Sequence, residues 1–186
     1  MPATRPAPAT RSAVEAEDDL ARELEQSKDR WVFVHRSGGL FTRGRVTGVS
    51  VTGWDRPTIL RIKAFERLET VDVCSHEIPD EGLSELAAEL PRLRQLRLSG
   101  PTTDEGLRNL RPLRNLQSLY LSSAHITDEG LEGLREIPSL REITLGNRGR
   151  VTEAVVTRFA RENGYAVVRE KRRGAAAEQI VLRRER

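Results

Sequence analysis

The chain has 186 residues and a single cysteine, and its 31 basic and 28 acidic residues leave a formal net charge of +3. A charge balance this even does not by itself indicate nucleic-acid binding, and one cysteine excludes an internal disulfide framework. The sequence has neither a run of about 18 apolar residues nor an N-terminal signal core, so we expect a cytoplasmic protein without a membrane span.

The N-terminal region divides into a tail and a helix. Residues 1–11 are rich in Pro, Ala, Thr and Arg, and this composition predicts a disordered tail. A helix is predicted from Ser12 to about Ser27. Between Ala13 and Asp29 there are seven acids and two bases, beside a thin apolar stripe. Such a helix is suited to cover the end of a repeat array.

Two stretches rich in β-branched and aromatic residues follow this helix. Trp31–Val34 and Arg45–Thr52 are predicted strands, and Ser37–Gly39 provides a turn between them. A hairpin at this place would cover the edge of a larger sheet, which otherwise invites aggregation. Residues 12–52 are therefore interpreted as an N-terminal cap.

Residues 53–150 contain an internal repeat. The phrase Asp-Glu-Gly-Leu begins at Asp80, Asp104 and Asp128, at intervals of 24 residues. Short strands with apolar residues at alternate positions recur with a similar spacing: Val71–Val73, Leu96–Leu98, Leu119–Leu121 and Ile143–Leu145. Self-similarity at this period predicts stacked units that bury one another's apolar sides. The acids recur at each predicted helix start, which favours helix capping over catalysis or Ca²⁺ binding.

The pattern drifts after Leu145 into a C-terminal cap at residues 151–186. It predicts a helix that ends near Asn163, a strand at Tyr165–Arg169 and a turn at Arg172–Ala175. Gln179–Leu182 is expected to pair back as a hairpin. Residues 12–186 are thus predicted to form a single domain.

The segment from Leu113 to Leu134 (LRNLQSLYLSSAHITDEGLEGL) resembles leucine-rich repeat proteins of the ribonuclease-inhibitor-like and cysteine-containing type, and small bacterial repeat proteins of planctomycete type. The resemblance implies an α/β fold: a right-handed solenoid, or horseshoe segment, with a parallel concave sheet, outer helices and hairpin caps at both ends. It also implies protein binding. The turn position that is often Asn or Cys in the family is His76, Pro101, Ala124 and Asn147 here. We therefore expect the usual polar ladder of that turn to be mostly absent.

Residues between the apolar members of each strand are expected on the concave side. A protein partner of unknown identity would contact this polar face, and Tyr and Arg often dominate such interfaces. The candidate partner-binding residues are Asp72, Gln95, Arg97, Ser118, Tyr120, Glu142 and Thr144. The alternative is a solvated face without a partner.

Enzymatic and metal chemistry find little support in the sequence. His35, His76 and His125 are the histidines, and no Cys or His pair has the spacing of metal ligands. Cys74 is predicted to be a buried or half-buried structural thiol, because no base is suggested near it. We therefore expect no catalytic residues, metal or cofactor.

The basic C-terminus gives an alternative function. Seven bases and three acids lie between Arg169 and Arg186, a pattern that could bind nucleic acid or an acidic partner. Nucleic acid is disfavoured because no aromatic residues are interleaved with these bases. The acidic N-terminal and basic C-terminal ends indicate either a monomer or weak head-to-tail self-association.

Overall fold

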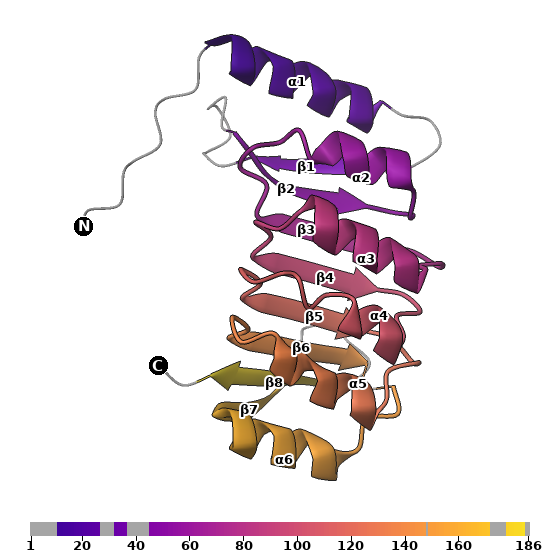
Figure 1. Cartoon of the computed structure of the whole chain (residues 1–186), viewed down its shortest axis with the longest axis vertical. Coiled ribbons are helices and arrows are strands. Elements are labelled where there is room, and N and C mark those ends of the chain that lie inside the picture. The colour runs from indigo at the N-terminus through magenta and orange to yellow at the C-terminus, as the bar shows by residue number, and fades with distance from the viewer. Residues whose placement is uncertain (1–10, 27–31, 37–44, 148, 172–177, 185–186) are drawn as a thin grey trace, which may run out of the picture.

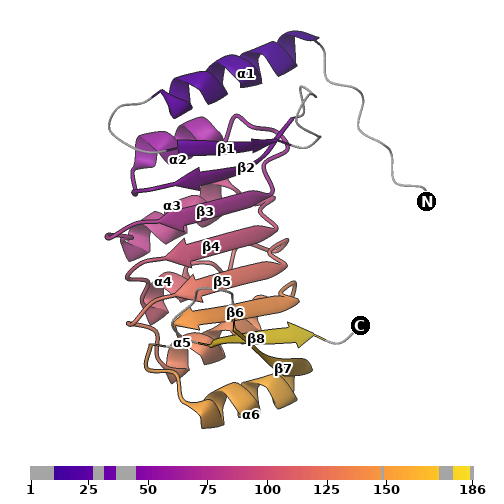
Figure 2. The ribbon, with the colours of Figure 1, turned by 180° about the vertical axis from the view of Figure 1, so that it is seen from behind.

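The computed structural model describes residues 11–26, 32–36, 45–147, 149–171 and 178–184. In these residues, helices and strands alternate and build one open sheet (Figure 1). Helices cover one face of the sheet, and no described helix covers the other face, which is seen directly in Figure 2. We call the uncovered side the open face. Among the described helices, none has the length and apolar character needed to cross a membrane.

The parallel part of the sheet follows the predicted repeats. The strands are β1 (Val32–Arg36), β2 (Val46–Val51), β3 (Thr70–Cys74), β4 (Gln95–Ser99), β5 (Ser118–Ser122), β6 (Glu142–Asn147), β7 (Tyr165–Glu170) and β8 (Gln179–Arg184). Strands β2 to β6 pair in sequence order and are parallel. Their alternate apolar residues are buried against the helices, as Leu119 (0% exposed) and Leu121 (1%) illustrate. Alternating helices and a mainly parallel sheet fit an α/β repeat fold.

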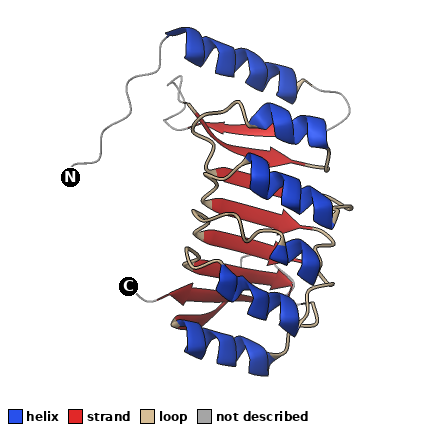
Figure 3. Cartoon of the chain, in the orientation of Figure 1, coloured by secondary structure: helices blue, strands red, loops and turns tan. Residues whose placement is uncertain are grey.

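The helices that cover the sheet (blue in Figure 3) are α2 (Arg56–Ile62), α3 (Asp80–Glu89), α4 (Asp104–Arg108), α5 (Asp128–Gly133) with a 3₁₀ turn at Leu134–Glu136, and α6 (Glu153–Asn163). Helix α2 is absent from the sequence prediction because it lacks the Asp-Glu-Gly-Leu phrase. The carboxylate of Asp55 caps it by accepting a hydrogen bond from the backbone N–H of Thr58 at 2.5 Å. Pro57 lies in its first turn, where proline is tolerated.

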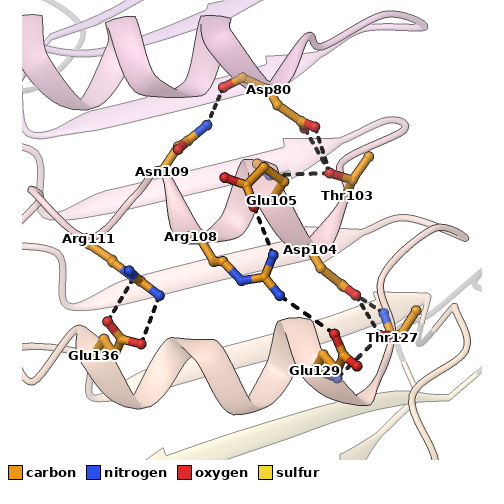
Figure 4. Close-up of polar contacts among 11 residues, drawn as sticks. Asp80, Thr103, Asp104, Glu105, Arg108, Asn109, Arg111, Thr127, Glu129 and Glu136 are labelled. Atoms are coloured by element: carbon orange, nitrogen blue, oxygen red, sulfur yellow. Dashed lines mark hydrogen bonds and ion pairs between the residues drawn. The ribbon is translucent and has the colours of Figure 1, made fainter.

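The Asp-Glu-Gly-Leu phrase connects neighbouring repeats. Threonine caps α4, α5 and α6, whereas Asp104 and Asp128 are the first helical residues of α4 and α5 and not their caps. The aspartate carboxylate accepts a hydrogen bond from the capping threonine hydroxyl of the next repeat: Asp80 from Thr103 at 2.9 Å and Asp104 from Thr127 at 2.5 Å (Figure 4). Asp128 accepts the corresponding bond from Thr152 at 3.0 Å. A ladder of polar side chains thus runs along the helix starts, apart from the turn positions at which the usual polar ladder was expected to be mostly absent.

The N-terminal helix α1 (Arg11–Glu25) lies beyond β1 at the end of the sheet (Figure 1). Its acidic side chains form several ion pairs with the body of the protein: Glu17 with Arg45 at 2.7 Å, Asp18 with Arg36 at 2.5 Å and Glu23 with Arg61 at 2.7 Å. Glu17 is only 7% exposed. Glu17 and Asp18 are thus turned inward and paired, while the other acids of α1 stay exposed: Glu15, Asp19, Glu23 and Glu25.

Both predicted hairpins are present. Strand β1 is antiparallel to β2 at one end, and β7 and β8 are antiparallel to each other at the opposite end. Strand β8 lies between β6 and β7 and is antiparallel to β6, an order that the sequence pattern does not predict. Residues 1–10 of the predicted tail and the predicted turns at 37–39 and 172–175 lie outside the described residues, whereas Arg11, the last residue of the predicted tail, begins α1.

Candidate functional site

The strand register places the predicted site residues in two rows across the open face. Residue Asp72 pairs with Arg97, Arg97 with Tyr120, and Tyr120 with Thr144. The second row follows the same register, one strand after another: Thr70, Gln95, Ser118 and Glu142. Because the strands are parallel and in register, residues that are 23 to 25 positions apart in the chain become neighbours across strands about 4.8 Å apart.

Three of these residues form a cluster at the middle of the open face. The Nε atom of Arg97 lies 3.7 Å from Oδ2 of Asp72, and the guanidinium carbon lies 4.6 Å from the centroid of the Tyr120 ring. The Arg97 side chain is 40% exposed and that of Asp72 is 33% exposed. A cation–π contact at such a site contributes about 0.5–1 kcal/mol, and an exposed ion pair no more. The cluster is therefore ordered in place while remaining accessible.

Gly146 makes room for the Tyr120 ring. A Cβ atom at Gly146 would lie only 2.3 Å from the Tyr120 hydroxyl oxygen and 2.7 Å from Cζ. The tyrosine therefore extends across β6, and its hydroxyl end lies against the glycine backbone. This contact fixes the direction of the ring from the side opposite to Arg97.

The open face is less accessible near its C-terminal end. Thr144 is only 9% exposed, so the expectation that it lies open to a partner is wrong. Its neighbours in the register are Tyr120 and Val181, both bulkier, and Val181 on the inserted strand β8 is itself buried. Glu142 remains half-exposed, but it accepts a hydrogen bond from Arg183 at 2.8 Å.

The single cysteine is exposed, contrary to the prediction of a buried or half-buried thiol. Cys74 ends β3, two residues after Asp72. Alternate residues of a strand point to the same face of the sheet, so the Cys74 side chain lies on the open face. It lines an open hollow of about 450 Å³ together with Trp54 and His76. Among the described residues, no group of three or more His, Cys, Asp or Glu is arranged to hold a metal ion.

The basic C-terminal segment uses its described arginines largely for internal contacts. Arg169 pairs with Glu153, and Arg183 pairs with both Glu142 and Glu170. The Arg184 guanidinium donates to the backbone carbonyls of Pro138 and Asn163 and lies 5.0 Å from the centroid of the Tyr165 ring. Internal pairing of these charges weakens the alternative of an anion-binding C-terminal cap. Arg172, Arg173 and Arg186 lie outside the described residues.

Comparison with known protein families identifies one repeat. Residues 113–134, which run from the turn before β5 into the 3₁₀ turn after α5, match the family model described as Leucine Rich repeat. This match supports a leucine-rich repeat protein, and such repeats generally serve protein interaction. A search of curated proteins finds no match.

Proposed function

We propose that this chain is a non-enzymatic protein-interaction module that binds a protein partner through the open face of its sheet. The single observation that carries the proposal is the Asp72–Arg97–Tyr120 cluster, which is both accessible and held by its own contacts. A surface that is already ordered loses little side-chain entropy when a partner binds. Arginine and tyrosine are also among the residues that most often dominate interface energies.

The proposed architecture is a short right-handed leucine-rich solenoid with closed ends. The repeats occupy 53–150, the N-terminal cap 12–52 and the C-terminal cap 151–186, all within one domain. In-register parallel strands, helices on one face and antiparallel strands at both ends support this proposal. In such an array the open face would be its concave side, and the partner would contact side chains from several repeats at once: Asp72, Gln95, Arg97, Ser118, Tyr120 and Glu142.

Site-specific photo-crosslinking tests the proposal. A photoreactive amino acid placed at Gln95, which is exposed on the open face, is expected to capture the partner. The same group placed at Glu129, whose side chain is 81% exposed on the helix side, is expected to capture none. Capture at both positions, or at Glu129 alone, would place the interface elsewhere.

Substitutions in the cluster complete the test. Arg97→Ala together with Tyr120→Ala is expected to abolish capture from Gln95, because both side chains of the cation–π contact are removed. The matched control is Arg108→Ala, which removes an exposed arginine that pairs with Glu105 and Glu129 on the helix side. If the double variant keeps full capture while remaining folded, the cluster is not part of the interface.

A further inference from the structure

A row of arginines lies along the edge of the sheet at which the parallel strands begin, away from the open-face cluster. They lie in the turns that lead into β3 to β6, where the arrows start in Figure 1: Arg67, Arg92, Arg94, Arg114 and Arg141. All five are exposed. With strands about 4.8 Å apart, the row extends over roughly 14 Å. We call it the strand-start edge.

Backbone hydrogen bonds hold these turns in a fixed order. The N–H of Arg94 donates to the carbonyl of Glu69 at 2.8 Å, and the N–H of Gln117 donates to the carbonyl of Arg94 at 2.7 Å. In the next repeat, the N–H of Arg141 donates to the carbonyl of Gln117 at 2.8 Å. Arg94 and Arg141 are themselves part of this backbone ladder, and the ladder sets the spacing of the successive turns that carry the arginines.

The positive charge of this edge is poorly compensated. Among the described residues, Arg94 meets Glu69 at 3.4 Å, whereas no carboxylate pairs with Arg67, Arg92, Arg114 or Arg141. The nearby acid Glu66 is already bound to Arg45 at 2.7 Å. The helix side is different, because Arg108, Arg111 and Arg158 each meet a glutamate there.

The strand-start edge is also hollowed. A cleft of about 540 Å³ is lined by Arg67, Arg92 and Arg94 together with Glu69. A second hollow of about 310 Å³ adjoins it, and its lining includes Phe65, Leu68, Leu90 and Pro91. The two hollows share Glu66, Leu68 and Arg92. A basic cleft and a more apolar one thus form a continuous groove.

We propose that the strand-start edge binds an acidic segment of a partner protein, with carboxylates on the arginines and an apolar side chain in the adjoining hollow. Guanidinium groups match carboxylates in charge and in the geometry of paired hydrogen bonds. Nucleic acid fits less well: among the described residues, Phe65 is the only aromatic side chain lining either hollow, and at 3% exposure it offers no stacking surface for bases.

Fluorescence anisotropy with two probes tests this proposal: a labelled peptide of Glu and Ser with a single Leu, and an oligothymidylate of matched charge. The peptide is expected to bind the full chain at low salt, and its affinity is expected to fall as salt increases. The double charge reversal R92E/R114E is expected to weaken peptide binding at least tenfold (about 1.4 kcal/mol). The control R150E/R161E changes the net charge equally at exposed arginines of the C-terminal turn and α6, and is expected to have little effect.

Each other outcome overturns the proposal. Tighter binding of the oligothymidylate than of the peptide would show that the edge prefers nucleic acid. Equal losses of peptide affinity in R92E/R114E and in the control would show that only the net charge of the protein matters. Absence of peptide binding at low salt would show that the edge does not bind acidic segments. Loss of peptide binding in Arg97→Ala/Tyr120→Ala would move the site to the open face. Thermal melts of every variant establish that it is folded, and a destabilised R92E/R114E is replaced by R92Q/R114Q, with the same order of affinities expected.

Discussion

The carboxylate of Asp104 occupies the space that a side chain at position 130 would need: a Cβ atom at Gly130 would lie 2.1 Å from Oδ1 of Asp104. The same relationship joins Asp80 to Gly106 at 2.6 Å, one repeat earlier. At Gly82 the indole of Trp54 fills the corresponding space. The glycine of each phrase therefore accommodates the neighbouring repeat, and the aspartate and glycine act as a pair across the repeat boundary.

Replacing Gly130 with alanine is expected to lower the free energy of unfolding by about 1–3 kcal/mol, because the added methyl group collides with the Asp104 carboxylate. This loss should exceed the gain of up to about 1 kcal/mol in helix propensity. Gly133→Ala in the same helix is the matched control, since its Cβ atom would approach only Arg108 Cγ, at 3.9 Å. Urea denaturation should find the control neutral or slightly stabilised, and similar losses in both variants would contradict the pairing.

The Asp104 and Gly130 pair also predicts non-additive effects. Asp104→Ala should cost about 1.5–3 kcal/mol, since it leaves the N–H and hydroxyl of Thr127 without their acceptor. In that background, Gly130→Ala should cost less than it does alone, because the colliding carboxylate is gone. Additive losses in the double variant would show that the two residues act independently.

The repeating part of the fold could be predicted from the sequence because the two periodicities agree. Alternation within a strand and recurrence every 22 to 25 residues both assign Leu119 to the core, and it is fully buried. The direction of the Asp-Thr bonds could not be predicted, because a capping aspartate and one that bonds to the next repeat have the same sequence spacing. Helix α2 has its own start signal at Asp55 and Pro57, which differs from the repeated phrase.

The candidate site could be predicted only where it depends on the alternation of side chains between the two faces of a strand. Alternation along the strands places Asp72, Arg97, Tyr120 and Cys74 on the open face, but alternation alone does not tell how exposed the Cys74 thiol is. The burial of Thr144 follows from the insertion of β8 beside β6, a contact between residues 37 positions apart in the chain. Local patterns carry no information on which strand of a terminal hairpin pairs with the sheet, so this part of the face required the structure.

Leu119 and Tyr120 are adjacent in β5, but truncating them to alanine should have different effects on stability. Leu119→Ala is expected to lower the free energy of unfolding by about 2–5 kcal/mol, because Leu119 is fully buried between sheet and helices. Tyr120→Ala and Arg97→Ala remove half-exposed side chains and should leave the melting temperature nearly unchanged while weakening partner binding. Calorimetry decides: strong destabilisation by both open-face variants would identify these residues as core and refute the strand register.

Arg45 is expected to hold helix α1 against the body of the protein. It donates hydrogen bonds to Glu17 and Glu66, both at 2.7 Å, and these bonds raise the pKa of Arg45 above its ordinary value. Arg45→Met would leave the buried Glu17 carboxylate without this cation, so amide hydrogens of α1 should exchange faster while those of β4 and β5 keep their protection. Arg22→Met is the control, because Arg22 and its partner Asp19 are 65% and 76% exposed. Unchanged exchange in α1 after Arg45→Met would show that apolar contacts alone hold the helix.

Tyr165 should make stability depend on pH in the alkaline range. Its hydroxyl donates to the backbone carbonyl of Leu140 at 2.9 Å, and burial raises the pKa of Tyr165 although Arg184 above the ring partly opposes the shift. Because the folded pKa exceeds the unfolded value of about 10, this stabilisation is fully present below that pH and is lost as pH rises through the folded pKa. Tyr165→Phe should cost about 1 kcal/mol near neutral pH through the lost hydrogen bond, and it cannot titrate. The difference in unfolding free energy between wild type and variant, measured by urea denaturation from neutral to alkaline pH, should therefore shrink above about pH 10. A difference that stays constant with pH would contradict the buried, hydrogen-bonded state of Tyr165.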